Sequence, residues 1–200
     1  MDIKRIAVGL LGTNCYIITD NGLACIIDPG ADCDKILSEI KGLKVDKIVL
    51  THGHFDHFMA AEKLKEKTGA PIYISEEDSE KLSDYRKSLY DIMGVGSDGF
   101  ISAGPDFFLA ETVELCNNKF EVIKTPGHSE GSVCLLFDKI LFSGDTLFKR
   151  SIGRYDRGSY DHLMRSLWNL MLLDDDITVL PGHGEATTIG DERAGNPFLM

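Results

Sequence analysis

The sequence has few basic residues and no long apolar run. Its 21 Lys and Arg stand against 32 Asp and Glu, which gives a formal net charge of -11. Because most of such a surface would repel a phosphate backbone, the composition argues against nucleic acid as a partner. No stretch approaches the roughly 20 consecutive apolar residues that cross a bilayer, so we expect no membrane span and no membrane partner.

The cysteines form neither pairs nor motifs. There are five of them, an odd number, and no C-x-x-C sequence. This pattern argues against a disulfide framework and indicates reduced thiols in a cytoplasmic protein. The first residues, "MDIKRIAVGLLGTNCY", imitate a signal peptide, but Gly12, Thr13 and Asn14 interrupt the apolar run, which alternates as a strand does. We therefore expect this segment to belong to the folded protein.

The chain is long enough to bury one core. With 200 residues, of which 43% are hydrophobic, it predicts a single domain over residues 1–200. The segment "CYIITDNGLACIIDPG" predicts two strands joined by a tight turn at Asn21-Gly22. Further β-rich runs alternate with helical patterns in both halves of the chain. This alternation predicts an α/β fold of four layers, an α/β/β/α sandwich.

The spacing of apolar residues predicts several helices, among them the two that follow. One spans residues 76–93, with Ile92 facing inward. The other spans residues 160–172, with Ser159 as its N-cap and a leucine stripe as core. His162 lies near the first turn of that helix, where we expect an exposed side chain that binds nothing.

Half of the six histidines lie within six positions of the segment "LTHGHFDHFMA". In an extended segment residues i and i+2 share a face, so His52 and His54 can bind one metal ion. Asp56 and His57, at the expected start of a helix, can point elsewhere and bind a second ion.

Three more candidate ligands each follow a strand-like run and adjoin a glycine. They are His128 in "TPGHS", Asp145 in "FSGDT" and His183 in "LPGHG". Nitrogen and oxygen donors suit Zn²⁺ and also iron or manganese, whereas structural zinc sites typically use cysteine. We therefore predict a catalytic centre with two divalent ions, zinc being the first choice. Such a pair lowers the pKa of a bridging water and polarises the carbonyl that it attacks, which predicts hydrolysis.

The run from His52 to His57 is an intact H-x-H-x-D-H motif, and nearly the whole chain resembles the metallo-β-lactamase superfamily. The resemblance implies that superfamily's four-layer fold and two metal sites bridged by Asp145. The other ligands it implies are His52, His54 and His128 for one site and Asp56, His57 and His183 for the other. It further implies catalytic roles for Asp56 and Asp145, and a place for Asp28 beside the centre without binding metal.

The stretch "GDTLFKRSIGRYDRGSYDHL" and the tail "LPGHGEATTIGDERAGNPFL" resemble glyoxalase II, the hydroxyacylglutathione hydrolases, and in particular their short bacterial relatives. This resemblance implies hydrolysis of a small-molecule thioester by a hydroxide that bridges the two metals. It also implies that Arg154 binds the glutathione carrier, with Tyr155 as its aromatic neighbour. Arg154 belongs to a basic group, whose other members are Lys149, Arg150 and Arg157.

A thioester also needs little proton donation from a protein when it is cleaved. Its leaving group is a thiolate, and because a thiol has a pKa of about 8.5, the thiolate leaves without being protonated first. The alternative is a persulfide dioxygenase of the same superfamily, an oxidoreductase with one iron held by two histidines and an aspartate. That activity would leave some of Asp56, His57 and His183 without a metal to bind. Lactone and β-lactam hydrolysis fit the metal ligands as well, and the sequence leaves the acyl group, the thiol carrier, the metal and the oligomeric state open.

One glycine-rich segment matches a pattern typical of dinucleotide binding. The segment "GVGSDG", residues 94–99, matches G-x-G-x-x-G, but it follows a helix-like stretch where a dinucleotide-binding fold has a strand. We expect a surface loop there, with a flap over the site as the alternative.

Overall fold

The computed structural model describes residues 1–155 and 158–199, and its strands form two six-stranded sheets and one two-stranded ribbon. The first sheet has the strand order of the sequence: β1 (Asp2–Val8), β2 (Thr13–Asp20), β3 (Leu23–Ile27), β4 (Lys44–Val49), β5 (Ile72–Ile74) and β6 (Phe107–Phe108). The second sheet has the order β14 (Thr187–Thr188), β13 (Thr178–Pro181), β10 (Ile140–Gly144), β9 (Val133–Phe137), β8 (Asn118–Lys124) and β7 (Thr112–Leu115). The ribbon pairs β11 (Leu147–Phe148) with β12 (Ser151–Ile152).

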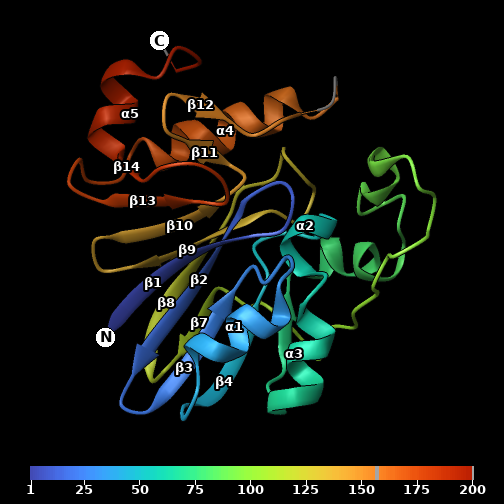
Figure 1. Cartoon of the computed structure of the whole chain (residues 1–200). Coiled ribbons are helices and arrows are strands. Elements are labelled where there is room, and N and C mark those ends of the chain that lie inside the picture. Colours follow the sequence, from blue (N-terminus) through green and yellow to red (C-terminus); the bar gives the residue numbers. More distant parts are fainter. Residues whose placement is uncertain (156–157, 200) are drawn as a thin grey trace.

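Helices lie outside both sheets. Those next to the first sheet are α1 (Cys33–Glu39), α2 (Phe55–Phe58) and α3 (Ala61–Thr68), and those next to the second are α4 (Tyr160–Leu170) and α5 (Ile189–Gly195). Figure 1 shows α4 and α5 on one side of the strands and α1 and α3 on the opposite side. Two short 3₁₀ helices, η1 (Glu76–Ser83) and η2 (Tyr90–Met93), follow β5.

Three clusters of buried side chains separate these layers. Neighbouring residues on a strand point to opposite faces, so β2 places Ile17 in the cluster under α1 and α3 and Ile18 in the cluster between the sheets. On the far side of the second sheet, Leu141 of β10 packs in a third cluster with Leu163 of α4. The predicted four-layer α/β/β/α arrangement is therefore confirmed.

The predicted hairpin and the helix after Ser159 are also present. Strands β2 and β3 pair antiparallel, and Asn21 and Gly22 between them have the positive φ angles that a tight turn needs. Helix α4 ends at Leu170, slightly earlier than predicted, with Ser159 in the N-cap position.

The prediction of one helix over residues 76–93 is wrong. The segment forms η1 and η2, separated by an extended Asp84 and a left-handed Leu89, and Ile92 is exposed. The Asp84 carboxylate accepts hydrogen bonds from the main-chain N–H groups of Arg86 and Lys87. Such a local bond competes with the helical pattern and explains the interruption.

The five cysteines are free and buried. Among residues 1–155 and 158–199, no helix is both long and apolar enough to cross a membrane.

Candidate metal centre

The seven predicted ligands come together at one edge of the two sheets. The first sheet supplies the segment from His52 to His57, which begins just after β4 and runs into α2. The second sheet supplies His128, Asp145 and His183, which follow β8, β10 and β13. These strands end at the same edge, so loops distant in sequence meet there. Figure 1 shows α2 at this edge, beside the ends of strands from both sheets.

Three of the predicted ligands form what we call the histidine trio: His52, His54 and His128. The Nδ1 atom of His54 lies 2.8 Å from Nε2 of His128, and that atom lies 3.2 Å from Nε2 of His52. His52 and His54 are buried and His128 is nearly so. The three rings thus present one nitrogen each to a common point.

Hydrogen bonds behind the histidine trio fix which ring nitrogens carry protons. The carbonyl oxygen of Arg154 can only accept, so Nδ1 of His128, 2.8 Å away, donates to it. The Thr51 hydroxyl donates to the Asp28 carboxylate at 2.7 Å and accepts from Nδ1 of His52 at 3.1 Å. The Nε2 atoms of both histidines are then unprotonated and face each other. Two facing lone pairs repel unless a cation lies between them, so the arrangement fits a metal ion.

The other ligands form what we call the mixed trio: Asp56, His57 and His183. Nδ1 of His57 donates to Asp28 at 3.0 Å, which leaves Nε2 unprotonated in the neutral ring. That atom is fully buried, has no hydrogen-bond partner among the described residues, and lies 3.5 Å from an Asp56 oxygen. Nε2 of His183 lies 3.2 Å from the same Asp56 oxygen, Oδ2, which also accepts from the Thr13 hydroxyl. A second cation fits here.

Asp145 lies between the two trios. Its Oδ1 is 3.4 Å from Nε2 of His57 and is buried, with no hydrogen-bond partner in the part of the chain that the structure describes. Its Oδ2 is 3.5 Å from Nε2 of His128 and 3.5 Å from Nε2 of His183. One carboxylate thus faces both groups, as a bridging ligand must.

The electrostatics of the two trios differ. Burial lowers the pKa of all three histidines in the histidine trio, that of His54 to about 3, so their rings stay neutral. Burial also disfavours a charged His57, but the carboxylates of Asp56, Asp145 and Asp28 outweigh it and raise its pKa well above the usual range. The mixed trio therefore attracts a positive charge, which a proton supplies when no metal ion is bound.

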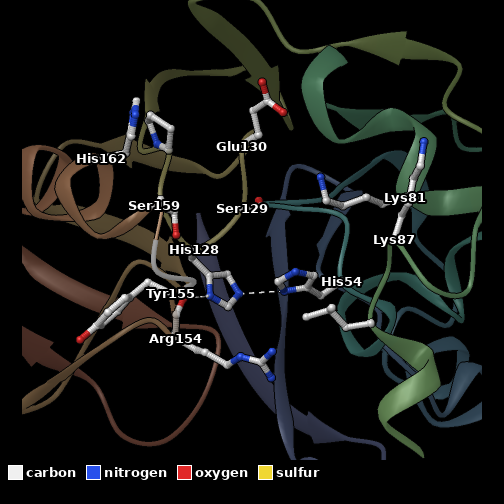
Figure 2. A pocket seen from close by; sticks show the side chains of 14 residues that line it. His54, Lys81, Lys87, His128, Ser129, Glu130, Arg154, Tyr155, Ser159 and His162 are labelled. Carbon is white, nitrogen blue, oxygen red and sulfur yellow. Dashed lines mark hydrogen bonds between the residues drawn. The ribbon is translucent and has the colours of Figure 1, made fainter.

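A pocket of about 390 Å³ adjoins the histidine trio, and His54 and His128 form part of its wall. Figure 2 shows Lys81 and Lys87 on one side of this pocket and Arg154 on the other, with the Arg154 side chain extending past His128 towards His54. Lys81 and Lys87 pair with Asp78 and Glu80, whereas no carboxylate among the described residues pairs with Arg154. The pocket thus offers an anion one available guanidinium.

The structure also shows where the other residues predicted at the site lie. Tyr155 lines the pocket, but its exposed ring packs against Tyr160 at 4.9 Å between centroids and points away from His54 (Figure 2). His162, exposed as predicted, lines the pocket too, which the sequence did not indicate. Of the predicted basic group, Lys149 pairs with Glu185, Arg150 binds the Gly195 carbonyl, and Arg157 lies outside the described residues.

The glycine-rich segment 94–99 follows η2, not a strand, so the dinucleotide-binding interpretation has no structural support.

Sequence reasoning missed one buried acid beside the centre. Asp78, in η1, is 0% exposed and contacts both loops that carry the histidine trio. It lies in the run "SEEDSEK", where four acids look alike and a solvated face is the simplest interpretation. Only the packing of η1 against the loops distinguishes it.

Comparison with known proteins identifies the family to which the chain is similar. A family model described as the metallo-beta-lactamase superfamily matches residues 8–183. The hydroxyacylglutathione hydrolase GloC of Haemophilus influenzae is 36% identical over 211 residues, which cover 100% of this chain and 98% of that protein. Among solved structures, the B3 metallo-beta-lactamase BLEG-1 matches with a TM-score of 0.91 at 33% identity, over 99% of both chains. TTHA1623, solved in a di-iron-bound form, matches with a TM-score of 0.83 at 34% identity, over 98% of this chain and 100% of that one.

Proposed function

The chain belongs to the metallo-beta-lactamase superfamily, and from that premise we propose that it is a dinuclear metal-dependent hydrolase that cleaves a small-molecule thioester. The observation that carries the proposal is the pair of converging trios that share Asp145 beside a pocket with an available guanidinium. The similarity to a hydroxyacylglutathione hydrolase supports the substrate class.

The residues assigned to hold the metals are those that the geometry brings together. The histidine trio would hold one ion, the mixed trio the other, and Asp145 both. Zinc is our first choice because all donors are nitrogen or oxygen, and the di-iron form of TTHA1623 supports iron as the alternative. When bound, such an ion pair makes a shared water acidic and polarises a substrate carbonyl.

The protein's own groups position the substrate. Arg154 would pair with a carboxylate of the thiol carrier, and this places the carrier in the pocket beside His54 and His128. The thioester carbonyl then lies towards Asp145, where the two trios meet. Cleavage breaks the C–S bond, water supplies the acid's hydroxyl, and the thiol leaves as a thiolate that needs little proton donation.

The decisive experiment measures metal content and reaction rates in one preparation. We expect about two divalent ions per chain, hydrolysis of a glutathione thioester, slower hydrolysis of a small neutral thioester, and no oxygen uptake with glutathione persulfide. One iron per chain with oxygen uptake and no thioester hydrolysis would contradict the proposal and favour the persulfide dioxygenase. Full metal content with cleavage of lactones or β-lactams alone would keep the hydrolase and reject the thioester.

A further inference from the structure

The carboxylate of Asp78 accepts four hydrogen bonds at the back of the metal centre. Its Oδ2 accepts from the main-chain N–H of Gly53 at 2.8 Å and from the Ser129 hydroxyl at 2.7 Å. Its Oδ1 accepts from the main-chain N–H of Gly131 at 2.8 Å and from Nζ of Lys81 at 2.5 Å. The side chain is fully buried, and its bonds with Gly53, Ser129 and Gly131 are made away from water, whereas the bond with Lys81 is partly buried.

Three of these donors belong to the two loops that carry the histidine trio, and the fourth, Lys81, lies in η1 itself. Gly53 stands between His52 and His54, and Ser129 follows His128 directly. One carboxylate thus joins a loop of the first sheet to a loop of the second at the position where both supply ligands. A buried carboxylate that receives two main-chain N–H groups fixes the main chain, because each N–H would lose its partner if its loop moved.

Two glycines permit this close approach. A Cβ atom on Gly53 would lie 2.8 Å from the main-chain oxygen of Asp78, and a Cβ atom on Gly131 would lie 2.7 Å from its main-chain nitrogen. Both distances are shorter than real Cβ contacts, so side chains there would push η1 away from the loops. The absence of side chains at both positions lets Asp78 reach the N–H groups.

The direction of the hydroxyl protons extends the network. Since the carboxylate accepts from Ser129, the Ser129 oxygen is left to accept from the Ser132 hydroxyl at 2.7 Å. The Ser132 oxygen in turn accepts from the main-chain N–H of Ser129 at 3.1 Å. Both hydroxyl groups in this hydrogen-bond network donate towards Asp78, and hydrogen bonds connected in this way strengthen one another.

We propose that Asp78 is a positioning residue that sets the separation of the histidine trio by clamping its two loops together. The inference rests on the proposed metal binding. It extends that proposal by predicting that the clamp serves one ion and not the other, because outside η1 the hydrogen bonds of Asp78 to described residues go to the His52–His54 loop and the His128 loop.

The test separates the two trios by deleting one ligand of each. In a His183→Ala background the remaining strong site is the histidine trio, and in a His54→Ala background it is the mixed trio. Adding Asp78→Asn should weaken binding of Zn²⁺ to metal-free protein about 10- to 100-fold in the first background and less than about threefold in the second. The matched control is Glu76→Gln, the same charge change at an exposed position of η1, which should leave both affinities unchanged.

A second readout needs no metal. In the metal-free protein, Asp78→Asn should speed hydrogen exchange at the N–H groups of Gly53 and Gly131 about tenfold or more, because an asparagine cannot accept from both sides. Ser129→Ala, which keeps the carboxylate, should cause a smaller change in the same direction. Equal loss of Zn²⁺ affinity in both backgrounds, or unchanged exchange at both glycines, would overturn the proposal. If the parent protein bound no metal while the exchange change appeared, the proposed function would fail and the clamp would stand.

Discussion

Two buried carboxylates, Asp28 and Asp78, support the metal centre, and they act on different atoms of it. Asp28 accepts from the ring of His57 and from the main-chain N–H and hydroxyl of Thr51. Asp78 accepts from the main chain of Gly53 and from other loop donors, and touches no ligand ring. The first determines where the protons of the rings lie, and the second determines where the loops lie. A metal site needs both, because a well-placed ring with the wrong tautomer cannot bind.

Asp28 acts on both trios, whereas Asp78 acts on one. Its bond to His57 acts on the mixed trio, and through Thr51 it orients the proton of His52 in the histidine trio. The comparison therefore predicts a general effect for one carboxylate and a local effect for the other. The following predictions test this division, starting with the residue that both trios share.

Asp145→Ala should have the largest effect, since its two oxygens face both trios. We expect both ions to bind more weakly. The rate of thioester hydrolysis should fall by more than the roughly 100-fold loss that typically follows removal of a hydrogen-bond partner of a metal ligand. Metal analysis after dialysis, together with steady-state rates, measures both effects. Loss of one ion with the other fully retained would show that Asp145 serves a single trio.

Removal of the metals should destabilise the whole fold. The ligands come from both sheets, and without cations the facing lone pairs and carboxylates repel. At free metal about 1,000 times the dissociation constant, one site contributes about 4 kcal/mol, and each kcal/mol shifts the melting temperature of a chain this long by about 2–4 °C. We expect a fall of roughly 8–16 °C for each site that chelation empties, measured by calorimetry. An unchanged melting temperature in protein shown to be metal-free would contradict it.

Asp28→Asn should weaken the binding of both ions about 10- to 100-fold. It should leave the two loops that carry the histidine trio in place. If the new amide nitrogen faces Nδ1 of His57, that atom must accept, and the ring proton moves to Nε2, where the metal should bind. Titration of metal-free protein with Zn²⁺ measures the loss. Hydrogen exchange at Gly53 and Gly131 should stay at the parent rate, which is the reverse of the Asp78→Asn result.

Arg154→Ala should leave the metals in place and act on the substrate alone. The guanidinium pairs with no described carboxylate, and its contact with a carrier would exist in the ground and transition states alike. We expect KM for a glutathione thioester to rise about 10- to 100-fold, with a smaller change in kcat.

A small neutral thioester is the control for Arg154→Ala and should be cleaved at the parent rate. Equal slowing of charged and neutral thioesters at full metal content would mean that Arg154 shapes the site and does not bind the carrier.

The sequence singled out the candidate ligands because their chemistry is local. The spacing from His52 to His57 and the strand-end context of His128 and His183 mark them before any fold is known, and the structure brings them together. Asp78 could not be predicted, because its neighbours in the sequence are acids of the same kind and its burial depends on how η1 packs. The division of 76–93 into two short helices was missed for a related reason, since the bonds of Asp84 compete with helical periodicity.

The N-terminal hairpin has a consequence for how the chain is made. The main-chain N–H of Asn14 donates to the Gly182 carbonyl at 2.7 Å, and the Tyr16 hydroxyl donates to the Pro181 carbonyl at 2.7 Å. Strand β2 therefore holds the loop of His183, although the ribosome adds that loop long after β2. Until it emerges, the mixed trio is incomplete, and an ion bound at His57 would lack a ligand. Binding of both proposed ions would therefore require that translation has passed His183 and that its loop has met β2.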